Sequence, residues 1–134
     1  MNTYAQLRLA AEAYAVPIGN VVEIASLGDL AVVPGARREI LGLRHLRGQI
    51  LPVIDLAQLL GVNVTAPPAQ LLVAESGCIT AGFAIDEVRH VGELPDPSEG
   101  AESDFLFGTM IHDGQLFAVI DVARIFSSLQ EAEA

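Results

Sequence analysis

Apolar and polar residues alternate along most of the chain, and glycine, proline or acidic residues interrupt the alternation at short intervals. Alternation with a period of two is typical of β-strands that bury one face. The pattern therefore predicts a mainly β protein built from short strands. We expect a strand, or a helical turn leading into one, at residues 20–26 and at the matching residues 86–91. Further strands are expected at residues 4–10, 14–18, 40–46, 49–54, 70–74, 79–85, 105–111 and 115–120.

Two short helices are predicted where the alternation stops, at residues 55–60 and 121–130. Asp55 and Asp121 each follow an apolar strand and open the helical segment, so we expect both carboxylates to cap helix N-termini. Gly61 is expected to end the first helix, because glycine adopts the left-handed conformation that commonly terminates helices.

The chain also contains an internal repeat, in which residues 42–60 recur 66 positions later as residues 108–126. The matched residues are Gly42 with Gly108, Gly48-Gln49 with Gly114-Gln115, and Val53-Ile54-Asp55 with Val119-Ile120-Asp121. Residues 16–27 match residues 83–94 more weakly, at a shift of 67, and chance similarity between apolar strands is the alternative there. A repeat of this length indicates one supersecondary unit used twice.

Two similar lobes are therefore predicted within a single domain of residues 1–134, approximately at residues 1–65 and 66–130, with the proline-containing segment 62–69 as the linker. Tight turns at Arg47-Gly48 and Asp113-Gly114 are expected to join hairpins. Several short strands in so small a lobe favour closed barrels over open sheets, because closure removes exposed sheet edges.

Charge narrows the classes of partner. The net charge is −10, which disfavours binding of nucleic acid through a basic face. Four of the seven arginines nevertheless lie within eleven residues, namely Arg37, Arg38, Arg44 and Arg47. Such a cluster suits an acidic protein partner, because opposite potentials steer association. A solvated strand edge that uses arginine to prevent unwanted pairing is an equally good interpretation.

Composition points to a cytoplasmic protein that folds without cross-links. Cys78 is the single cysteine, so no internal disulfide is possible, and we expect it to be a buried structural residue. No apolar run approaches the length of a membrane span. The N-terminus lacks the basic and apolar regions typical of a signal peptide, so a cytoplasmic location without membrane insertion is expected.

No established catalytic, metal or cofactor motif is present, so we predict neither catalysis nor a bound cofactor. His45, His90 and His112 share no spacing that indicates a metal site. Asp55 and Asp121 occupy equivalent repeat positions, and a pair of carboxylates is able to perform acid–base chemistry. Helix capping in separate lobes is the favoured interpretation, and a small enzyme using this pair is the alternative.

The segment Leu43–Leu56 resembles the CheW-like domain, the scaffold of bacterial chemosensory arrays. The first part of the family pattern is matched at Gly42, Leu46, Arg47 and Gly48, and the second at Pro52, Val53, Asp55, Leu56 and Gly61. Weaker matches flank it, at Val21, Glu23 and Ile24, at Pro34, and at Ala81–Val88. The resemblance covers nearly the whole chain.

This resemblance implies two SH3-like five-stranded β-barrels packed on a shared hydrophobic seam. It also implies a non-enzymatic adaptor that couples the cytoplasmic tips of chemoreceptors to a CheA-type histidine kinase, through the regulatory domain of the kinase, at membrane-associated arrays. The receptor-facing residues implied are Arg47, Gly48, Val21, Glu23 and His45. Kinase docking is implied for the apolar ends of the barrels, whose residues the sequence does not identify.

His45 departs from the family pattern, which has asparagine before Leu46, Arg47 and Gly48. Histidine is larger than asparagine and titrates near neutral pH. The departure indicates a divergent pathway, such as one for surface motility or gene regulation. It also leaves open a divergent paralogue that binds the kinase and not receptors.

Overall fold

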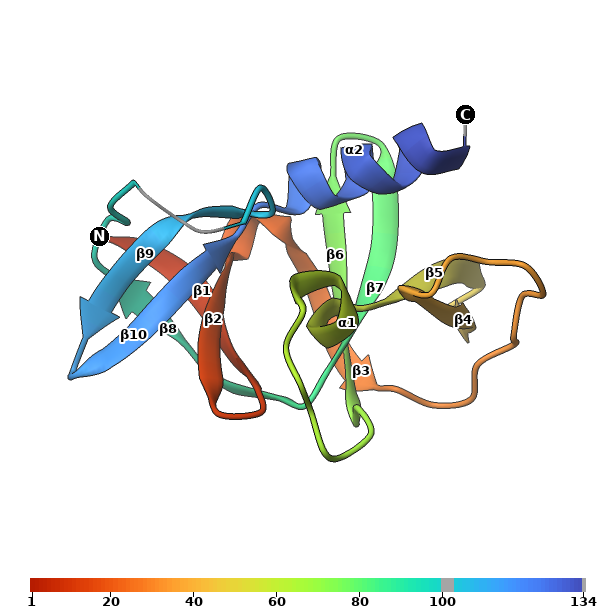
Figure 1. Cartoon of the computed structure of the whole chain (residues 1–134), viewed down its shortest axis with the longest axis horizontal. Coiled ribbons are helices and arrows are strands. Elements are labelled where there is room, and N and C mark those ends of the chain that lie inside the picture. Colours follow the sequence, from red (N-terminus) through yellow and green to blue (C-terminus); the bar gives the residue numbers. More distant parts are fainter. Residues whose placement is uncertain (100–102, 134) are drawn as a thin grey trace.

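The structure, a computed structural model, describes residues 1–99 and 103–133, with only the backbone described for residues 131–133. It contains ten strands, a 3₁₀ turn (Ile18–Asn20) and two helices in the described ranges (Figure 1). The strands are β1 (Asn2–Leu9), β2 (Glu12–Pro17), β3 (Val21–Ser26), β4 (Ile40–Leu46), β5 (Gln49–Asp55), β6 (Gln70–Ser76), β7 (Ile79–Ile85), β8 (Glu87–Leu94), β9 (Leu106–His112) and β10 (Gln115–Ile120). The helices are α1 (Leu56–Leu60) and α2 (Val122–Glu133).

The strands form two five-stranded sheets with the same order of equivalent strands. Lobe A has the order β8-β1-β2-β10-β9, and lobe B has the order β3-β6-β7-β5-β4. The one parallel pairing in each sheet joins β2 to β10 and β5 to β7. The predicted mainly β fold with two five-stranded lobes is confirmed. The lobes are incompletely closed, since no ladder in the described residues joins β8 to β9 or β3 to β4.

The lobes differ from the sequential halves, residues 1–65 and 66–130, that the repeat suggested. Strands β1 and β2 join β8–β10 in lobe A, whereas β3–β5 join β6 and β7 in lobe B. The two repeats thus exchange their first two strands, and segment 62–69 links repeats rather than lobes. Strands β1 and β6 are repeat equivalents and offer the same edge for pairing. The exchange therefore leaves no trace in the local sequence pattern. Sequence similarity therefore identifies the repeated unit without identifying which copy it pairs with.

Three apolar clusters hold these sheets together. One lies inside lobe A and includes Tyr4, Met110 and Phe117, and a second lies inside lobe B and includes Leu51 and Val53. The third and largest is the seam between the lobes, formed from both sheets and both helices. Its fully buried members are Ala5, Leu7, Leu9, Val16, Ile54, Leu56, Leu72, Ala74, Phe83, Ile85, Ile120, Val122 and Ile125.

The repeated glycines, Gly42 and Gly108, are explained by a close approach of backbone. In lobe B the backbone amides and carbonyls of Ala31 and Leu43 exchange hydrogen bonds of 2.8 and 2.9 Å beside Gly42. A Cβ atom on Gly42 would lie 2.6 Å from the Ala31 carbonyl oxygen, and the equivalent Gly108 meets the Ser98 carbonyl even more closely. A side chain at either position would push away the loop that covers the edge strand.

The seam predicts a large difference between two phenylalanines. Phe83 is 0% exposed at the seam, whereas Phe107 is 58% exposed on β9. Truncation of a fully buried phenylalanine to alanine leaves a cavity, so Phe83→Ala should lower the free energy of unfolding by about 3–5 kcal/mol. Phe107→Ala should change it by less than about 1 kcal/mol. Urea denaturation monitored by circular dichroism measures both values, and similar losses for the two variants would contradict this account of the seam.

Candidate partner-binding surface

The β4–β5 hairpin ends in a two-residue turn whose backbone is strained at an arginine. Arg47 has φ 51° and Gly48 has φ 78°, and Leu46 pairs directly with Gln49. Two successive positive φ values define a type I′ turn, which favours Asn-Gly, whereas a side chain such as arginine costs about 1 kcal/mol or more in this conformation. Local backbone preference therefore does not account for arginine at the tip.

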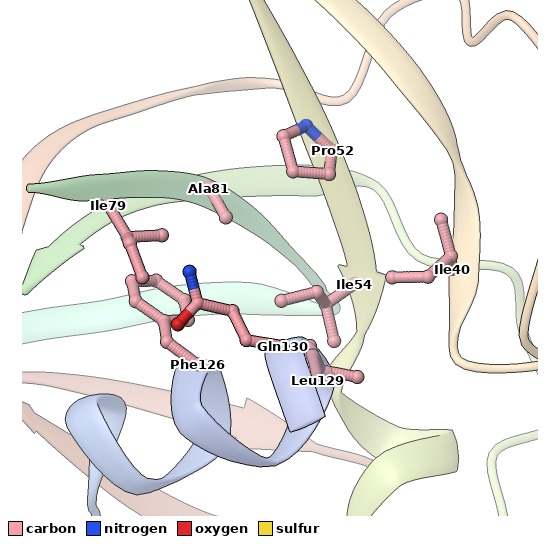
Figure 2. A pocket seen from close by; sticks show the side chains of 8 residues that line it. All are labelled: Ile40, Pro52, Ile54, Ile79, Ala81, Phe126, Leu129 and Gln130. Carbon is pink, nitrogen blue, oxygen red and sulfur yellow. The ribbon is translucent and has the colours of Figure 1, made fainter. Parts of the chain in front are cut away.

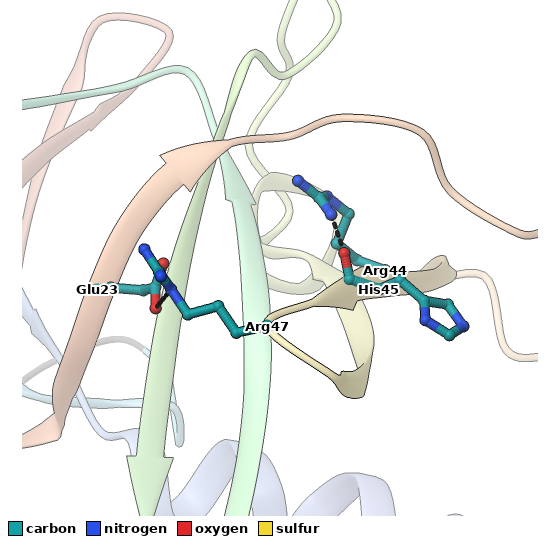
Figure 3. A network of polar contacts seen from close by, with 4 residues as sticks. All are labelled: Glu23, Arg44, His45 and Arg47. Carbon is teal, nitrogen blue, oxygen red and sulfur yellow. Dashed lines mark hydrogen bonds and ion pairs between the residues drawn. The ribbon is translucent and has the colours of Figure 1, made fainter.

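The side chain of Arg47 crosses the gap between the two edge strands of lobe B. Its Nε atom lies 2.8 Å from the Glu23 Oε2 atom on β3 (Figure 3). The Arg47 side chain is 76% exposed, so water screens the pair, and its net stabilisation is about 1 kcal/mol at most. The guanidinium is therefore accessible to a partner that offers a competing carboxylate or carbonyl.

Four of the five residues that the resemblance implies as receptor-facing lie together at this edge. Gly48 shares the turn with Arg47, Glu23 lies opposite, and His45 is exposed on β4, its ring directed away from the ion pair in Figure 3. Val21 is the exception, because its side chain is partly buried against the seam.

Val22 and Ile24 are instead the exposed apolar residues of β3. Exposure alternates along this strand, so the outward positions are offset by one residue from Val21. The only charged residue of the strand, Glu23, lies on its less exposed face, so the usual rule that polar residues face solvent does not identify the outward face. Ile18, in the 3₁₀ turn that precedes β3, is also exposed.

The other clustered arginines all have partners within the chain. Arg37 Nε lies 3.3 Å from a carboxylate oxygen of Glu39. Arg38 contacts the side-chain amide of Gln58, whose oxygen accepts from the guanidinium at 2.9 and 3.1 Å when it faces Arg38. Arg44 donates from Nε to the Leu27 carbonyl oxygen at 2.8 Å, and from Nη1 to the His45 carbonyl oxygen. The predicted acidic-partner patch is thus divided among separate internal contacts.

Asp55 and Asp121 occupy helix starts in different lobes. The Asp55 Oδ1 atom accepts the Gln58 amide hydrogen at 3.2 Å, and the Asp121 Oδ1 atom accepts that of Arg124 at 3.0 Å. Asp55 ends β5 in lobe B, whereas Asp121 follows β10 in lobe A. This is the geometry of capping carboxylates. Within residues 1–99 and 103–133, no group of three His, Cys, Asp or Glu side chains is placed to hold a metal ion.

A second exposed apolar surface lies on the β9–β10 hairpin of lobe A. Ile111 is 69% exposed and Leu116 is 55% exposed, and the two residues are directly opposite in register. The repeat-equivalent pair in lobe B is His45 and Ile50. Sequence reasoning did not single out this surface, although apolar residues at solvent-facing positions of a hairpin are a signal that could have identified it. Cys78 is exposed as well, contrary to the expectation of burial.

An apolar groove runs between α2 and lobe B (Figure 2). Ala81 lies in its floor, beside Ile79 and Phe126. The repeat-equivalent position in lobe A is Tyr14, whose hydroxyl donates to a carboxylate oxygen of Glu12 at 2.7 Å. Burial, together with the adjacent Glu12 carboxylate, raises the pKa of Tyr14 well above its usual range. The groove in lobe B is thus lined by the methyl group of Ala81 where lobe A has an aromatic ring.

Comparison with known proteins places the chain in a family. Residues 3–130 match the CheW-like domain. The chain belongs to the CheW-like domain family. Among CheW-like relatives, the chemotaxis protein CheW of Rhizobium meliloti (strain 1021) is 26% identical over 137 residues, covering 95% of this chain and 88% of the relative. The chemotaxis protein CheW of Thermotoga maritima is 28% identical over 132 residues, covering 91% and 85%.

A solved CheW-like structure supports the same assignment. The crystal structure of the scaffolding protein TtCheW from Thermoanaerobacter tengcongensis superposes with a TM-score of 0.78 at 26% identity, over 89% of this chain and 88% of that one. The two-lobed β fold described above is the fold of that scaffolding protein. In the described parts of the chain, neither helix has the length and apolar character needed to cross a bilayer.

The strained turn predicts that Arg47 is replaceable without loss of stability. Arg47→Asn removes an exposed ion pair worth about 1 kcal/mol at most and places a favoured residue in the type I′ turn. We expect the free energy of unfolding to stay within about 0.5 kcal/mol of wild type, as measured by urea denaturation. A loss of about 2 kcal/mol would show that the Arg47–Glu23 pair is a principal stabilising contact of lobe B.

Proposed function

We propose that this protein is a non-enzymatic coupling protein that links chemoreceptors to a CheA-type histidine kinase in a bacterial chemosensory pathway. Membership of the CheW-like family supports the adaptor role. The observation that carries the proposal is the presence of two separate exposed surfaces on one rigid pair of lobes. An adaptor needs two such surfaces, because it must bind two partners at once and fix their relative position.

The receptor surface is the β3–β4 edge of lobe B. It combines exposed apolar residues, Val22 and Ile24, with the exposed guanidinium of Arg47. These side chains flank one strand edge, so they suit an amphipathic receptor helix docked along that edge, and the planar guanidinium is able to bind a carboxylate or terminal carbonyls of the helix bidentately. Residues 18–85 also carry four of the seven arginines and only five of the seventeen acidic residues, which favours approach of an acidic segment at this lobe.

The kinase surface is the outer face of the β9–β10 hairpin, centred on Ile111 and Leu116. Large side chains exposed side by side are characteristic of protein interfaces. The regulatory domain of the kinase is itself CheW-like by the family resemblance, so it presents comparable hairpins. Contacts of this kind are individually weak and gain strength when many adaptors and kinases assemble at receptor arrays on the cytoplasmic side of the membrane.

The receptor role of Arg47 is tested by charge reversal. Arg47→Glu should weaken binding to receptor cytoplasmic fragments by about tenfold or more, because it replaces a donor by a carboxylate at a charge-assisted contact. Arg124→Glu is the matched control, because Arg124 is exposed on α2 and this substitution changes the net charge by the same amount. Isothermal titration calorimetry measures both affinities. Equal affinities for the two variants would refute a receptor contact at Arg47.

Kinase docking is tested on the opposite lobe. The double variant Ile111→Ser with Leu116→Ser should weaken binding to the isolated regulatory domain of the cognate kinase by about thirtyfold, as expected for removal of interface anchors. Val32→Ser is the control, because Val32 is 80% exposed on the loop before β4. Unchanged kinase binding in the double variant would show that the kinase does not dock on the β9–β10 hairpin. Wild-type binding to the kinase alone, without receptor binding, would instead identify a divergent paralogue that does not contact receptors.

A further inference from the structure

The open side of lobe B lies between the edge strands β3 and β4, and a single side chain closes one end of it. Arg44 extends from β4 to the carbonyl oxygen of Leu27, the residue that follows β3, with Nε at 2.8 Å. Its Nη1 atom also faces the carbonyl oxygen of the adjacent residue, His45 (Figure 3). Arg44 is thereby fixed between the two edges.

Gly28 provides the space for this contact. A Cβ atom on Gly28 would lie 2.6 Å from Arg44 Nε and 2.8 Å from Cζ, so any larger residue would displace the guanidinium. The neighbouring loop is paired to β4 only between Ala31 and Leu43. The spacing of the two edges therefore depends on that backbone pair, on Arg44, and on the exposed Arg47–Glu23 ion pair at the turn.

Lobe A shows what the same position does elsewhere in the chain. The repeat equivalents of Arg44 and Leu27 are Met110 and Leu94, which are both buried in the apolar cluster inside that lobe. In lobe A apolar packing thus occupies this position, and no arginine is required there. The fold itself therefore does not require a guanidinium at the equivalent site of lobe B. The residue at that site, Arg44, is three residues from Arg47 in the sequence.

We propose that Arg44 is a positioning residue for the receptor surface. By joining the end of β3 to β4, its guanidinium holds Arg47 and His45 at a fixed distance from Ile24 and the rest of β3. A partner that contacts both edges then meets a preorganised surface and avoids the entropic cost of ordering it. This role rests on the proposed function, because it concerns the same surface.

Gly28→Ala tests the proposal without removing any charged group. It should displace the guanidinium of Arg44 and weaken receptor-fragment binding by about fivefold, through the cost of ordering the surface on binding. Gly35→Ala is a closely matched control. Gly35 lies in the same loop with φ 78°, against 67° for Gly28, but a Cβ atom there meets nothing within 4 Å. The two variants share the backbone penalty and differ in their effect on Arg44.

Arg44→Met and Arg44→Lys extend the test. Methionine reproduces the lobe A residue and should preserve folding while weakening receptor binding, whereas lysine lacks the forked geometry and should not rescue the affinity. Hydrogen exchange of the Ala31 and Leu43 amides provides a readout that needs no partner, and exchange should accelerate in Gly28→Ala and both Arg44 variants. Kinase binding, which uses lobe A, should stay at the wild-type value in all of them.

The outcomes separate this proposal from the proposed function. Equal receptor affinity in Gly28→Ala and Gly35→Ala, or full affinity in Arg44→Met, would overturn a positioning role for Arg44. Unchanged amide exchange in the Arg44 variants would overturn it as well. If wild-type protein binds no receptor fragment, the proposed function fails, and the exchange measurement still decides whether Arg44 fixes the two edges.

Discussion

The apolar seam between the lobes is the interaction on which the rest of the structure depends. Each repeat contributes its first two strands to one lobe and its last three to the other, so the chain passes from one lobe to the other after β2 and back again after β7. Fully buried side chains such as Leu72, Phe83 and Ile120 fill it from both sheets. Close-packed interiors resist deformation, so the lobes behave as one body. Surfaces on opposite lobes consequently keep a constant relative orientation.

The two lobes share strand order and turn geometry yet present different chemistry. Met110 and Tyr14 of lobe A are replaced in lobe B by Arg44 and Ala81, and Ile111 is replaced by His45. Backbone hydrogen bonds and glycine positions are the features that both lobes retain. Duplication has therefore preserved what the backbone requires, and the side chains that face solvent or line the openings have diverged. This divergence gives one fold two exposed surfaces of different chemistry.

Local sequence patterns were sufficient to predict most strands and helices, but they did not predict which distant segments contact each other. Alternation located the strands, and Asp55 was recognised as a helix cap from the residues around it alone. The exchange of strands between lobes was missed, because β1 and β6 are equivalent and nothing in either segment specifies its neighbour. The contacts of Arg44 and Arg38 were missed for a similar reason. Arg44 meets Leu27 across the opening of lobe B, and Arg38 meets Gln58 on α1. Both contacts form only when the chain folds.

The exchange of strands also fixes an order of assembly during synthesis. All five strands of lobe B are present once residue 85 has left the ribosome, since they occupy residues 21–85. Strands β1 and β2 are made first, but their partners β8 and β10 are among the last to appear. The β1–β2 hairpin therefore remains unpaired along both of its outer edges while lobe B forms. Strands β1 and β2 are consequently the strands that wait longest for their partners in the sheet.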